Sequence, residues 1–469
     1  METENYDFIV IGAGSAGYAA ARTALSHTRR IAIVDGADEL GGLCILRGCM
    51  PSKTVIVAAD VLHLARHGED FGLEIPVARA NMPAIARRTA RIIGEFADDR
   101  RAALKSEEFD LYRSSARFTG AHEIELADGR RLRGKKFLIA TGSQVRFPPI
   151  PGLEEAGVWT SDNVLALDFV PDSVIVLGAG AVGCELAQFL ARIGSRVTLI
   201  QRGERILTGM REEAARVVEQ AFVDEGLELF TGTAVQEIRR AGEGFEAVFE
   251  CHGEPVVRRA SFCLNALGRS PNTARLDLAE AGVGFSGDGR IKADSNQRTS
   301  NPDIYAAGDC CGPHEIVHLA VRQGETAANH AFGKPEEPLP MHPSLQVIFT
   351  DPQVAVAGLS DPELVALGRK FTTASYPFSD HGRSILMEAK RGFVRIAADV
   401  ETGELLGAEI VGCDAGELIH CLAIAITLKA TVFDLLRVPW YHPTLAEIIS
   451  YPVEEIAEEI LGRRTAGPE

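Results

Sequence analysis

A succession of strand, glycine-rich turn and helix occurs twice in this chain, and it limits the possible folds more than any other feature. In the first copy, an apolar strand pattern over residues 7–11 leads into the turn 12–17 (GAGSAG), and an alanine-rich helix pattern follows. In the second copy, strand 173–177 leads into the turn 178–183 (GAGAVG) and a helix pattern that runs through Ala191. Such units build parallel sheets covered by helices, so we expect an α/β fold with two Rossmann-like dinucleotide-binding domains.

The three glycines of each turn have separate tasks. The first permits the tight turn, the second lets backbone N–H groups approach a pyrophosphate, and the third allows close packing of helix on strand. The N-terminus of the following helix adds the positive end of a dipole. The predicted nucleotide-binding positions are therefore Gly12, Gly14 and Gly17 in the first unit and Gly178, Gly180 and Gly183 in the second.

The residues after the second strand of each unit differ. Asp35 follows strand 31–34, where a carboxylate can accept hydrogen bonds from ribose hydroxyls, so the first unit is predicted to hold the ADP half of a dinucleotide with an unphosphorylated ribose. At the same place the second unit has Gln201 and Arg202, and the carboxylate that would repel a 2′-phosphate is absent. This pattern predicts NAD(P)H with a lean toward NADPH. The alternative is that Arg202 is a solvated loop residue and the coenzyme is NADH.

Length, charge and cysteine content narrow the class of protein. A chain of 469 residues with 46% hydrophobic and 24% charged residues is typical of a globular protein with several domains. The net charge of −17 argues against nucleic acid as a partner. The apolar run 8–11 is too short for a signal peptide or a membrane span, which predicts a cytoplasmic protein without a membrane partner. Nine cysteines fit reduced thiols with one catalytic pair better than a disulfide framework.

The candidate catalytic pair is Cys44 and Cys49 in the segment 41–53 (GGLCILRGCMPSK). Pro51 can start a helix, and thiols near a helix N-terminus and Lys53 are expected to have depressed pKa values, which favours the thiolate that disulfide exchange requires. A zinc site would need two further ligands at suitable spacing, so no metal is predicted.

The cysteine segment resembles the redox-active disulfide of the class I pyridine nucleotide-disulfide oxidoreductases, which include dihydrolipoamide dehydrogenase, glutathione reductase and mercuric reductase. The resemblance implies FAD in the first unit, with Cys49 as the charge-transfer thiol against the flavin and Cys44 as the interchange thiol exposed to substrate. It also implies an ion pair of Lys53 with Glu185 near the flavin N5. Further predicted cofactor contacts are Asp309, at the ribityl or pyrophosphate of FAD, with Gly42, Thr141, Gly142 and Gly268.

A second part of the resemblance lies near the C-terminus. Residues 440–447 (WYHPTLAE) are similar to the family's His-Pro-Thr-x-x-Glu, in which a His oriented by a carboxylate acts as general acid and base. These residues are His442 and Glu447 in this chain. In the family this His acts on the disulfide of the partner subunit, which implies a homodimer with an active site shared between subunits.

The order of the motifs divides the chain into four segments. We expect the first part of an FAD-binding domain with the redox disulfide over 1–147, an NAD(P)-binding domain over 148–267, the second part of the FAD domain over 268–338, and an α+β dimerisation domain over 339–469. A helical stretch is expected over about 51–106, and the Pro-rich stretch 335–343 is expected to open the last segment.

The resemblance leaves the substrate open. A dihydrolipoamide dehydrogenase-like enzyme acting on a small-molecule or lipoyl-type thiol or disulfide is favoured. The alternatives are a mercuric reductase-like or glutathione reductase-like NADPH enzyme, an NAD(P)H oxidase, and an NAD(P)H-binding flavoprotein sensor or structural subunit. Mercuric reductases usually lack the C-terminal His and end in a vicinal Cys pair, whereas this sequence ends in RTAGPE.

Several residues have competing interpretations. Cys310 and Cys311 are interpreted as small residues that pack beside the flavin, with a metal or relay function as the alternative. His381 is interpreted as an ordinary loop residue, with a place at a substrate entrance as the alternative. The remaining cysteines are expected in the core, and they are Cys184, Cys251, Cys263, Cys413 and Cys421.

Overall fold

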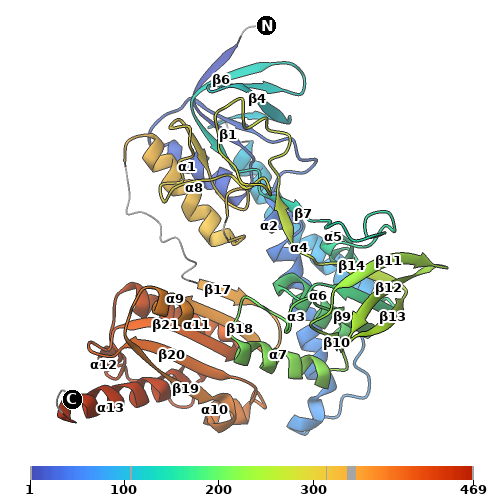
Figure 1. The fold of residues 1–469 in the computed structure, drawn as a ribbon, viewed down its shortest axis with the longest axis vertical. Coiled ribbons are helices and arrows are strands. Elements are labelled where there is room, and N and C mark those ends of the chain that lie inside the picture. The colour runs from blue at the N-terminus through green and yellow to red at the C-terminus, as the bar shows by residue number, and fades with distance from the viewer. Residues whose placement is uncertain (1–2, 106–107, 313, 335–344, 467–469) are drawn as a thin grey trace.

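The computed structural model describes residues 3–105, 108–312, 314–334 and 345–466. It contains two nucleotide-binding folds and a C-terminal domain with an antiparallel sheet, which confirms the predicted fold class (Figure 1). The residue limits predicted for the four segments stay predictions. The Pro-rich stretch 335–343 lies outside the described residues.

The first nucleotide-binding fold is built on a seven-stranded sheet. Its order is β3-β2-β1-β6-β5-β4, with β16 also paired to β6, and strands β3, β2, β1, β6 and β16 run parallel. The strands are β1 (Glu4–Ile11), β2 (Ile31–Val34), β3 (Asp110–Tyr112), β4 (Ala116–Gly120), β5 (Glu123–Leu126), β6 (Arg131–Ile139) and β16 (Ile304–Ala306). Helix α1 (Ser15–Ala24) packs against α8 (Val317–Ala331). The return of the chain at β16 places Asp309 in this fold, as predicted.

The second nucleotide-binding fold has a four-stranded parallel sheet, in the order β10-β9-β8-β14. These strands are β8 (Ser173–Leu177), β9 (Arg196–Ile200), β10 (Glu228–Phe230) and β14 (Phe262–Asn265), with helices α5 (Ser161–Leu165), α6 (Ala181–Ile193) and α7 (Glu212–Asp224). A separate antiparallel sheet consists of β11 (Val235–Ala241), β12 (Gly244–Cys251) and β13 (Glu254–Ala260). Strands β7 (Ser143–Val145) and β15 (Arg269–Pro271) pair where the chain passes between the two folds.

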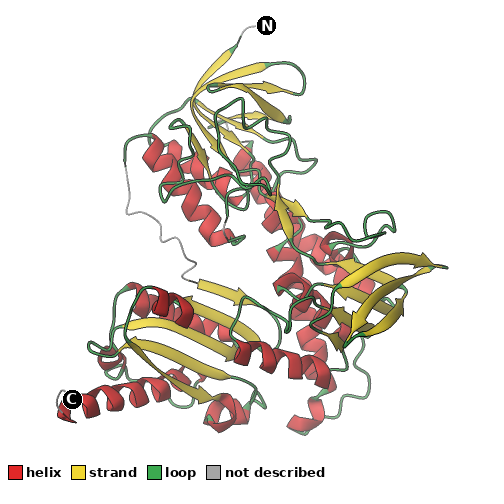
Figure 2. Cartoon of the chain, viewed as in Figure 1, coloured by secondary structure: helices red, strands yellow, loops and turns green. Residues whose placement is uncertain are grey.

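The C-terminal domain carries a five-stranded antiparallel sheet flanked by helices (Figure 2). Its strands are β17 (Leu345–Ile348), β18 (Gln353–Gly358), β19 (Phe371–Pro377), β20 (Phe393–Asp399) and β21 (Leu405–Gly412). The helices are α9 (Asp361–Ala366), α10 (Gly382–Leu386), α11 (Ala415–Thr427), α12 (Val432–Leu435) and α13 (Ser450–Ala466), with short 3₁₀ turns η2 (Phe378–Asp380) and η3 (Leu445–Ile449).

The single helical stretch predicted over 51–106 is wrong in detail. The chain forms α2 (Gly42–Leu46), α3 (Cys49–Arg66), the 3₁₀ turn η1 (Gly68–Phe71) and α4 (Met82–Leu104). Gly72 adopts a left-handed conformation with φ of 72° and ends η1, and residues 73–81 connect to α4 without helical structure. Among the described residues, α2 and α3 together (42–66) have the length and hydropathy of a membrane span, and α3 packs against α4 and α6.

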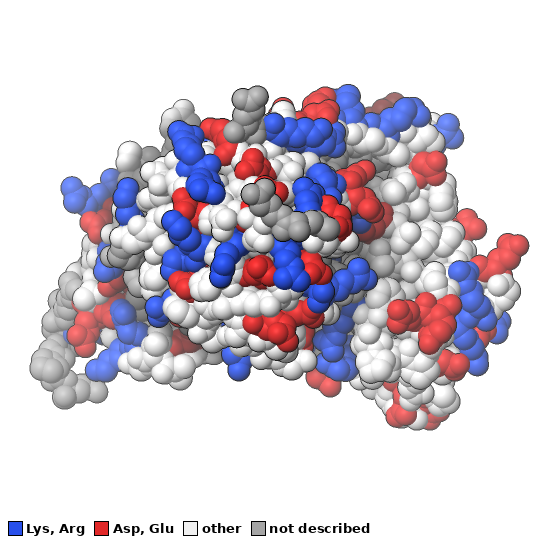
Figure 3. Space-filling model, turned by 90° about the horizontal axis from the view of Figure 1, so that it is seen from above, with Lys and Arg blue, Asp and Glu red and all other residues white. Residues whose placement is uncertain are grey.

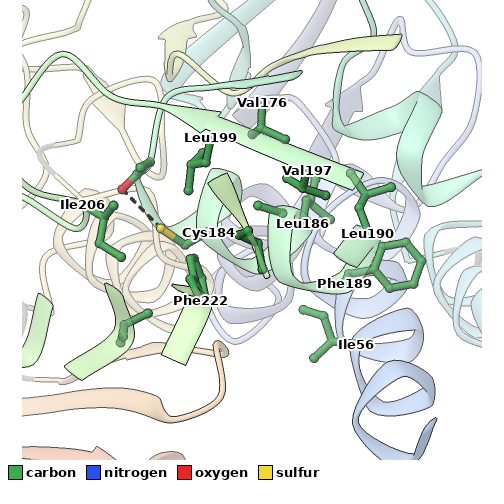
Figure 4. Close-up of a cluster of buried hydrophobic side chains, with 14 of the residues drawn as sticks. Ile56, Val176, Cys184, Leu186, Phe189, Leu190, Val197, Leu199, Ile206 and Phe222 are labelled. Carbon is green, nitrogen blue, oxygen red and sulfur yellow. Dashed lines mark hydrogen bonds between the residues drawn. The ribbon is translucent and has the colours of Figure 1, made fainter. Parts of the chain in front are cut away.

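One hydrophobic core connects all three domains. Ile56 of α3 lies near Phe189 of α6 in Figure 4, and Ile348 and Val411 of the C-terminal domain belong to the same cluster. Cys184 is fully buried there and its thiol donates to the Ala179 carbonyl at 3.4 Å. Burial of this apolar surface fixes α3, the helix that carries the predicted redox residues, against the second nucleotide-binding fold.

Acidic and basic side chains are interspersed on the outer surface. In the view of Figure 3, Lys and Arg alternate with Asp and Glu, and neither sign forms a continuous patch. The net charge of −17 is therefore not concentrated on this face.

Candidate active site

Two glycines of the first glycine-rich turn, Gly12 and Gly17, have no room for a side chain, whereas a Cβ atom on Gly14 would meet only the Gly42 Cα, at 4.0 Å. A Cβ atom on Gly12 would lie 2.3 Å from the Ala140 carbonyl oxygen, and one on Gly17 would lie 1.9 Å from the Gly12 carbonyl oxygen. Gly42 crosses directly over this turn, because its Cβ would lie 2.7 Å from the Gly14 Cα. The start of the redox segment and the turn at the N-terminus of α1 thus form one cradle.

Polar groups around this cradle fit the adenosine and pyrophosphate parts of FAD. Asp35 Oδ2 accepts a hydrogen bond from the Ala13 N–H at 2.7 Å, which places the carboxylate at the mouth of the turn. The Thr141 hydroxyl is buried and has no hydrogen-bond partner in the described parts of the chain. A buried polar group without a partner is costly, and a bound cofactor would supply that partner.

The predicted contact Asp309 lies at the junction of the two nucleotide-binding folds. Its Oδ2 accepts a hydrogen bond from the Ser143 hydroxyl at 2.6 Å, and Arg269 donates to the same hydroxyl at 2.7 Å. Gly142 and Gly268, which precede β7 and β15, have positive φ values of 68° and 100°, and a Cβ atom on either would meet no atom within 4 Å. Asp309 therefore belongs to a polar network at the end of the cradle, while its contact with FAD stays a prediction.

The two candidate redox cysteines lie at the junction of α2 and α3. Cys44 lies within α2, and Cys49 is the first residue of α3, two residues before the helix start predicted at Pro51. Both are half-buried thiols. The hydrogen bond with Cys44 lowers the pKa of Cys49 to about 7, and the charge of Lys53 acts in the same direction, against burial.

The same hydrogen bond and burial raise the pKa of Cys44. The prediction of a depressed pKa is thus right for Cys49 and wrong for Cys44. A dithiol that shares one hydrogen bond holds its negative charge on the sulfur that accepts the bond, and here that is Cys49. This assignment agrees with the implied function of Cys49 as the thiolate next to the flavin.

Lys53 and Glu185 form the predicted ion pair. Lys53 Nζ lies 2.7 Å from Glu185 Oε2, and their side chains are 31% and 7% exposed. Glu185 Oε1 also accepts from the Phe349 N–H at 2.9 Å, and the Lys53 ammonium lies 4.6 Å from the Phe349 ring centroid. The pair therefore joins α3 to α6 and to the C-terminal domain, one turn along α3 from Cys49.

The second glycine-rich turn is more open. A Cβ on Gly183 would lie 1.9 Å from the Gly178 carbonyl oxygen, but one on Gly180 would meet no atom within 4 Å. Gln201 Oε1 accepts from the Ala179 N–H at 3.1 Å, in the position that Asp35 has in the first unit. Arg202 is exposed and forms no ion pair with the described residues.

His442 and Glu447 form the predicted dyad near the C-terminus. His442 Nδ1 lies 2.8 Å from Glu447 Oε1, and this bond lowers the pKa of Glu447. The His442 side chain is 74% exposed, so Nε2 is free to act on a molecule outside the chain. In Figure 1, α2, which carries Cys44, lies beside the first nucleotide-binding fold, whereas α13, which follows the dyad, lies in the C-terminal domain.

The structure favours a packing function over a catalytic or binding function for the other candidate residues, Cys310, Cys311 and His381. Cys310 and Cys311 are buried in the core of the first fold, as their packing interpretation predicts. His381 is 1% exposed and its Nδ1 lies 2.8 Å from the Ser384 hydroxyl, which favours the interpretation as a structural residue over a place at an entrance.

The core prediction for the other five cysteines is right for Cys184 and Cys263 and wrong for Cys421, which is exposed on α11. Cys251 and Cys413 are half-buried. The described residues hold no group of three His, Cys, Asp or Glu suited to a metal ion.

One residue beside the cysteines was not predicted. Arg100 of α4 stacks on Tyr18 of α1, with its Cζ 4.1 Å from the ring centroid, and its charge lowers the pKa of Cys44 against the larger effects that raise it. The sequence of α4 contains several arginines at helical spacing, and no sequence motif distinguishes Arg100 from the others.

Comparison with known proteins agrees with this geometry. The family described as pyridine nucleotide-disulphide oxidoreductase matches residues 6–324, and its dimerisation domain matches residues 344–452. Mercuric reductase from Lysinibacillus sphaericus is 31% identical over 448 residues, which cover 95% of this chain and 82% of that protein. Dihydrolipoyl dehydrogenase from Thermus scotoductus is 33% identical over 465 residues, which cover 98% and 99%. The crystal structure of LpdA from Mycobacterium tuberculosis superposes with a TM-score of 0.86 at 27% identity and covers 97% of this chain and 100% of that one.

Two nucleotide-binding folds, a cysteine pair at a helix start and a dimerisation domain define a flavoprotein disulfide reductase. The chain belongs to the pyridine nucleotide-disulphide oxidoreductase family, and its dimerisation domain implies a homodimer. Relatives of similar identity include both mercuric reductases and dihydrolipoyl dehydrogenases.

Proposed function

We propose that this protein transfers electrons between NAD(P)H and a thiol or disulfide substrate through Cys44 and Cys49, with chemistry of the dihydrolipoyl dehydrogenase type. The observation that carries the proposal is the position of Cys49 at the start of α3, one turn from Lys53, with its pKa lowered to about 7. A thiolate available near neutral pH is what disulfide exchange requires.

The chain's own residues support a balanced exchange. In the reducing direction, His442 of the partner subunit takes the proton of the Cys44 thiol, the Cys44 sulfur bonds to one substrate sulfur as the substrate S–S bond breaks, and His442 gives the proton to the sulfur that leaves. The Cys49 thiolate then attacks the Cys44 sulfur, which releases the second substrate sulfur and leaves a Cys44–Cys49 disulfide. FAD, when bound, supplies the two-electron carrier between this disulfide and the nicotinamide. The oxidation of a dithiol uses the same steps in reverse.

The participation of a second subunit is supported by the exposure of the dyad. The His442 side chain is 74% exposed, while Glu447 is largely buried and orients the ring. Large apolar side chains of the same domain are also exposed, with Ile424 at 60%, Leu428 at 74% and Tyr441 at 78%. Exposed apolar surface favours association with a second copy, which would bring His442 to the partner's Cys44.

We propose NADPH as the preferred coenzyme. An exposed guanidinium at Arg202, free of ion pairs with the described chain, can bind a 2′-phosphate. Gln201 already accepts from the turn and carries no charge that would repel the phosphate.

The experiment is an assay of the purified FAD-loaded dimer with NADPH and with NADH, using lipoamide, lipoate, glutathione disulfide, Hg(II) or no added acceptor. Disulfide-dependent turnover is expected to fall by about 100-fold or more in Cys44→Ser, because the interchange nucleophile is lost. Cys251→Ser, which changes a half-buried thiol of β12, is the matched control and should behave as the wild type. Full disulfide turnover in Cys44→Ser would contradict the proposal. NADPH oxidation that needs Hg(II) and ignores every disulfide would favour a mercuric reductase.

A further inference from the structure

Arg100 presents an unpaired positive charge beside the interchange cysteine. It lies near the end of α4, the helix that packs against α2, in which Cys44 lies. Its Nη1 is buried and has no hydrogen-bond partner among the described residues. The Tyr18 ring, in the first turn of α1, supports one face of the guanidinium at 4.1 Å.

Two other arginines of the same helix are paired with acids. Arg91 Nη1 lies 2.7 Å from Glu95 Oε1, and Arg101 pairs with Asp98. Arg100 has no such partner within the described chain, although it is less exposed than Arg91. A buried guanidinium N–H without an acceptor destabilises the free protein, and an acceptor that arrives from outside would remove this cost.

The charge of Arg100 acts at the site where substrate must bind. It favours the thiolate form of Cys44, and the Cys44 thiolate in turn favours the charged form of Arg100. Burial lowers the pKa of Arg100, but an arginine stays protonated at neutral pH. A substrate sulfur in reach of Cys44 therefore brings the neighbouring substrate atoms close to a fixed cation and an aromatic ring.

We propose that Arg100, stacked on Tyr18, binds a carboxylate of the substrate, so that the preferred substrate is a small anionic disulfide or dithiol. The inference rests on the proposed function and deepens it. A guanidinium recognises a carboxylate through short charge-assisted hydrogen bonds, and the aromatic ring holds its plane in place. A lipoyl group in amide linkage to a carrier protein offers no such charge, whereas the free acid does.

The test compares lipoate with lipoamide, which share the same dithiolane and differ in a carboxylate against an amide. Each is reduced with saturating NADPH by the wild-type dimer, and the measured quantity is the ratio of the two kcat/KM values. We expect the wild type to favour lipoate by about 10-fold or more and Arg100→Met to lower the ratio to about 1, as loss of a charge-assisted hydrogen bond predicts. Any effect of the substitution on the Cys44 nucleophile changes both substrates alike and cancels in the ratio.

Two further variants and one binding measurement refine the result. Arg100→Lys keeps the charge and should retain part of the preference for lipoate, and Arg101→Met, which removes the neighbouring paired arginine, should retain all of it. In the Cys44→Ser background, which cannot turn over, calorimetry should show that Arg100→Met weakens the binding of lipoate and leaves that of lipoamide unchanged.

Equal kcat/KM values for the two substrates in the wild type, or an unchanged ratio in Arg100→Met, would overturn the inference and leave the proposed function standing. Purified Arg100→Met without FAD would place the guanidinium against the cofactor and would also overturn it. Reduction of neither substrate, with NADPH oxidation insensitive to Cys44→Ser, would overturn the proposed function and the inference together.

Discussion

The two glycine-rich units share their fold and differ in how tightly the turn is enclosed. In both, the first strand ends at a glycine whose Cβ would collide with a neighbouring carbonyl, at Gly12 and Gly178. In the first unit Gly42 lies over the second glycine, whereas in the second unit Gly180 faces open space. The same secondary structure thus occurs in two different surroundings.

The two units also differ in the side chain that accepts a hydrogen bond from the backbone of the turn. Asp35 accepts from Ala13 in the first unit, and Gln201 accepts from Ala179 in the second. The equivalent bonds show that the strand-end side chain contacts the turn in both units, and only the side chain of the first unit carries a charge. An enclosed turn with an acid suits a cofactor that stays bound, and an open turn without one suits a coenzyme that binds and leaves.

The largest expected effect comes from adding a side chain at the close contact between Gly42 and Gly14, which only the first unit has. In Gly42→Ala, a Cβ 2.7 Å from the Gly14 Cα, at a φ of 77°, must displace the turn, so we expect the purified protein to keep less than about a tenth of the wild-type FAD. The ratio of flavin to protein absorbance measures this. Gly180→Ala is the matched control, since it meets no atom within 4 Å and should keep its FAD. Equal flavin loss in both variants would show that the two turns do not differ in enclosure.

The next effect tests the selection of the coenzyme by the second unit. Arg202→Gln is expected to lower kcat/KM for NADPH by about 10- to 100-fold and to leave that for NADH within about threefold, because one charge-assisted contact to the 2′-phosphate is lost. Arg196→Gln, at the opposite end of β9, should change neither value. A wild type that prefers NADH, or an equal fall with both coenzymes, would contradict the proposed preference for NADPH.

The smallest expected effect concerns the ion pair of Lys53 with Glu185, which links α3 to α6. A thiol carries its charge above its pKa, so the long-wavelength absorption of the Cys49 thiolate against flavin in the two-electron-reduced enzyme should be present above pH 7 and fade as the pH falls through about 7. Lys53 lowers that pKa, and Lys53→Met should move the midpoint upward by about one unit, which is about 1.4 kcal/mol.

Glu185→Gln provides a change of opposite sign, because the Glu185 carboxylate raises the pKa of Cys49. The midpoint should therefore move to lower pH. Midpoints that stay at the wild-type value in both variants would show that the Lys53–Glu185 pair does not act on the Cys49 thiolate.

The sequence predicted two nucleotide-binding strands to the residue, at 31–34 and 173–177. Each is a short run rich in Val, Ile or Leu that ends at a turn signal, so strand propensity, burial and turn chemistry agree. The region after Cys44 was less predictable. The five-residue helix α2 has no cap or periodicity of its own, and α3 begins before its proline.

The unpredicted parts of the site depend on contacts between distant segments. Arg100 is one of several arginines in α4, and only its packing on Tyr18 and against α2 makes it different. The thiol of Cys44 differs from that of Cys49 because of a shared hydrogen bond, which residue types alone do not encode. Cys421 was placed in the core by its residue type, but α11 also has an exposed face, and that residue lies on it.

Whether Cys44 and Cys49 lie in the path of the electrons can be measured by an anaerobic titration of the FAD-loaded dimer with NADPH while the visible spectrum is recorded. We predict that two electrons per subunit produce a long-wavelength thiolate–flavin absorption band before the flavin is bleached, and that Cys49→Ser abolishes this band. Direct bleaching of the wild-type flavin by the first two electrons, without the band, would contradict the proposed relay through the cysteines.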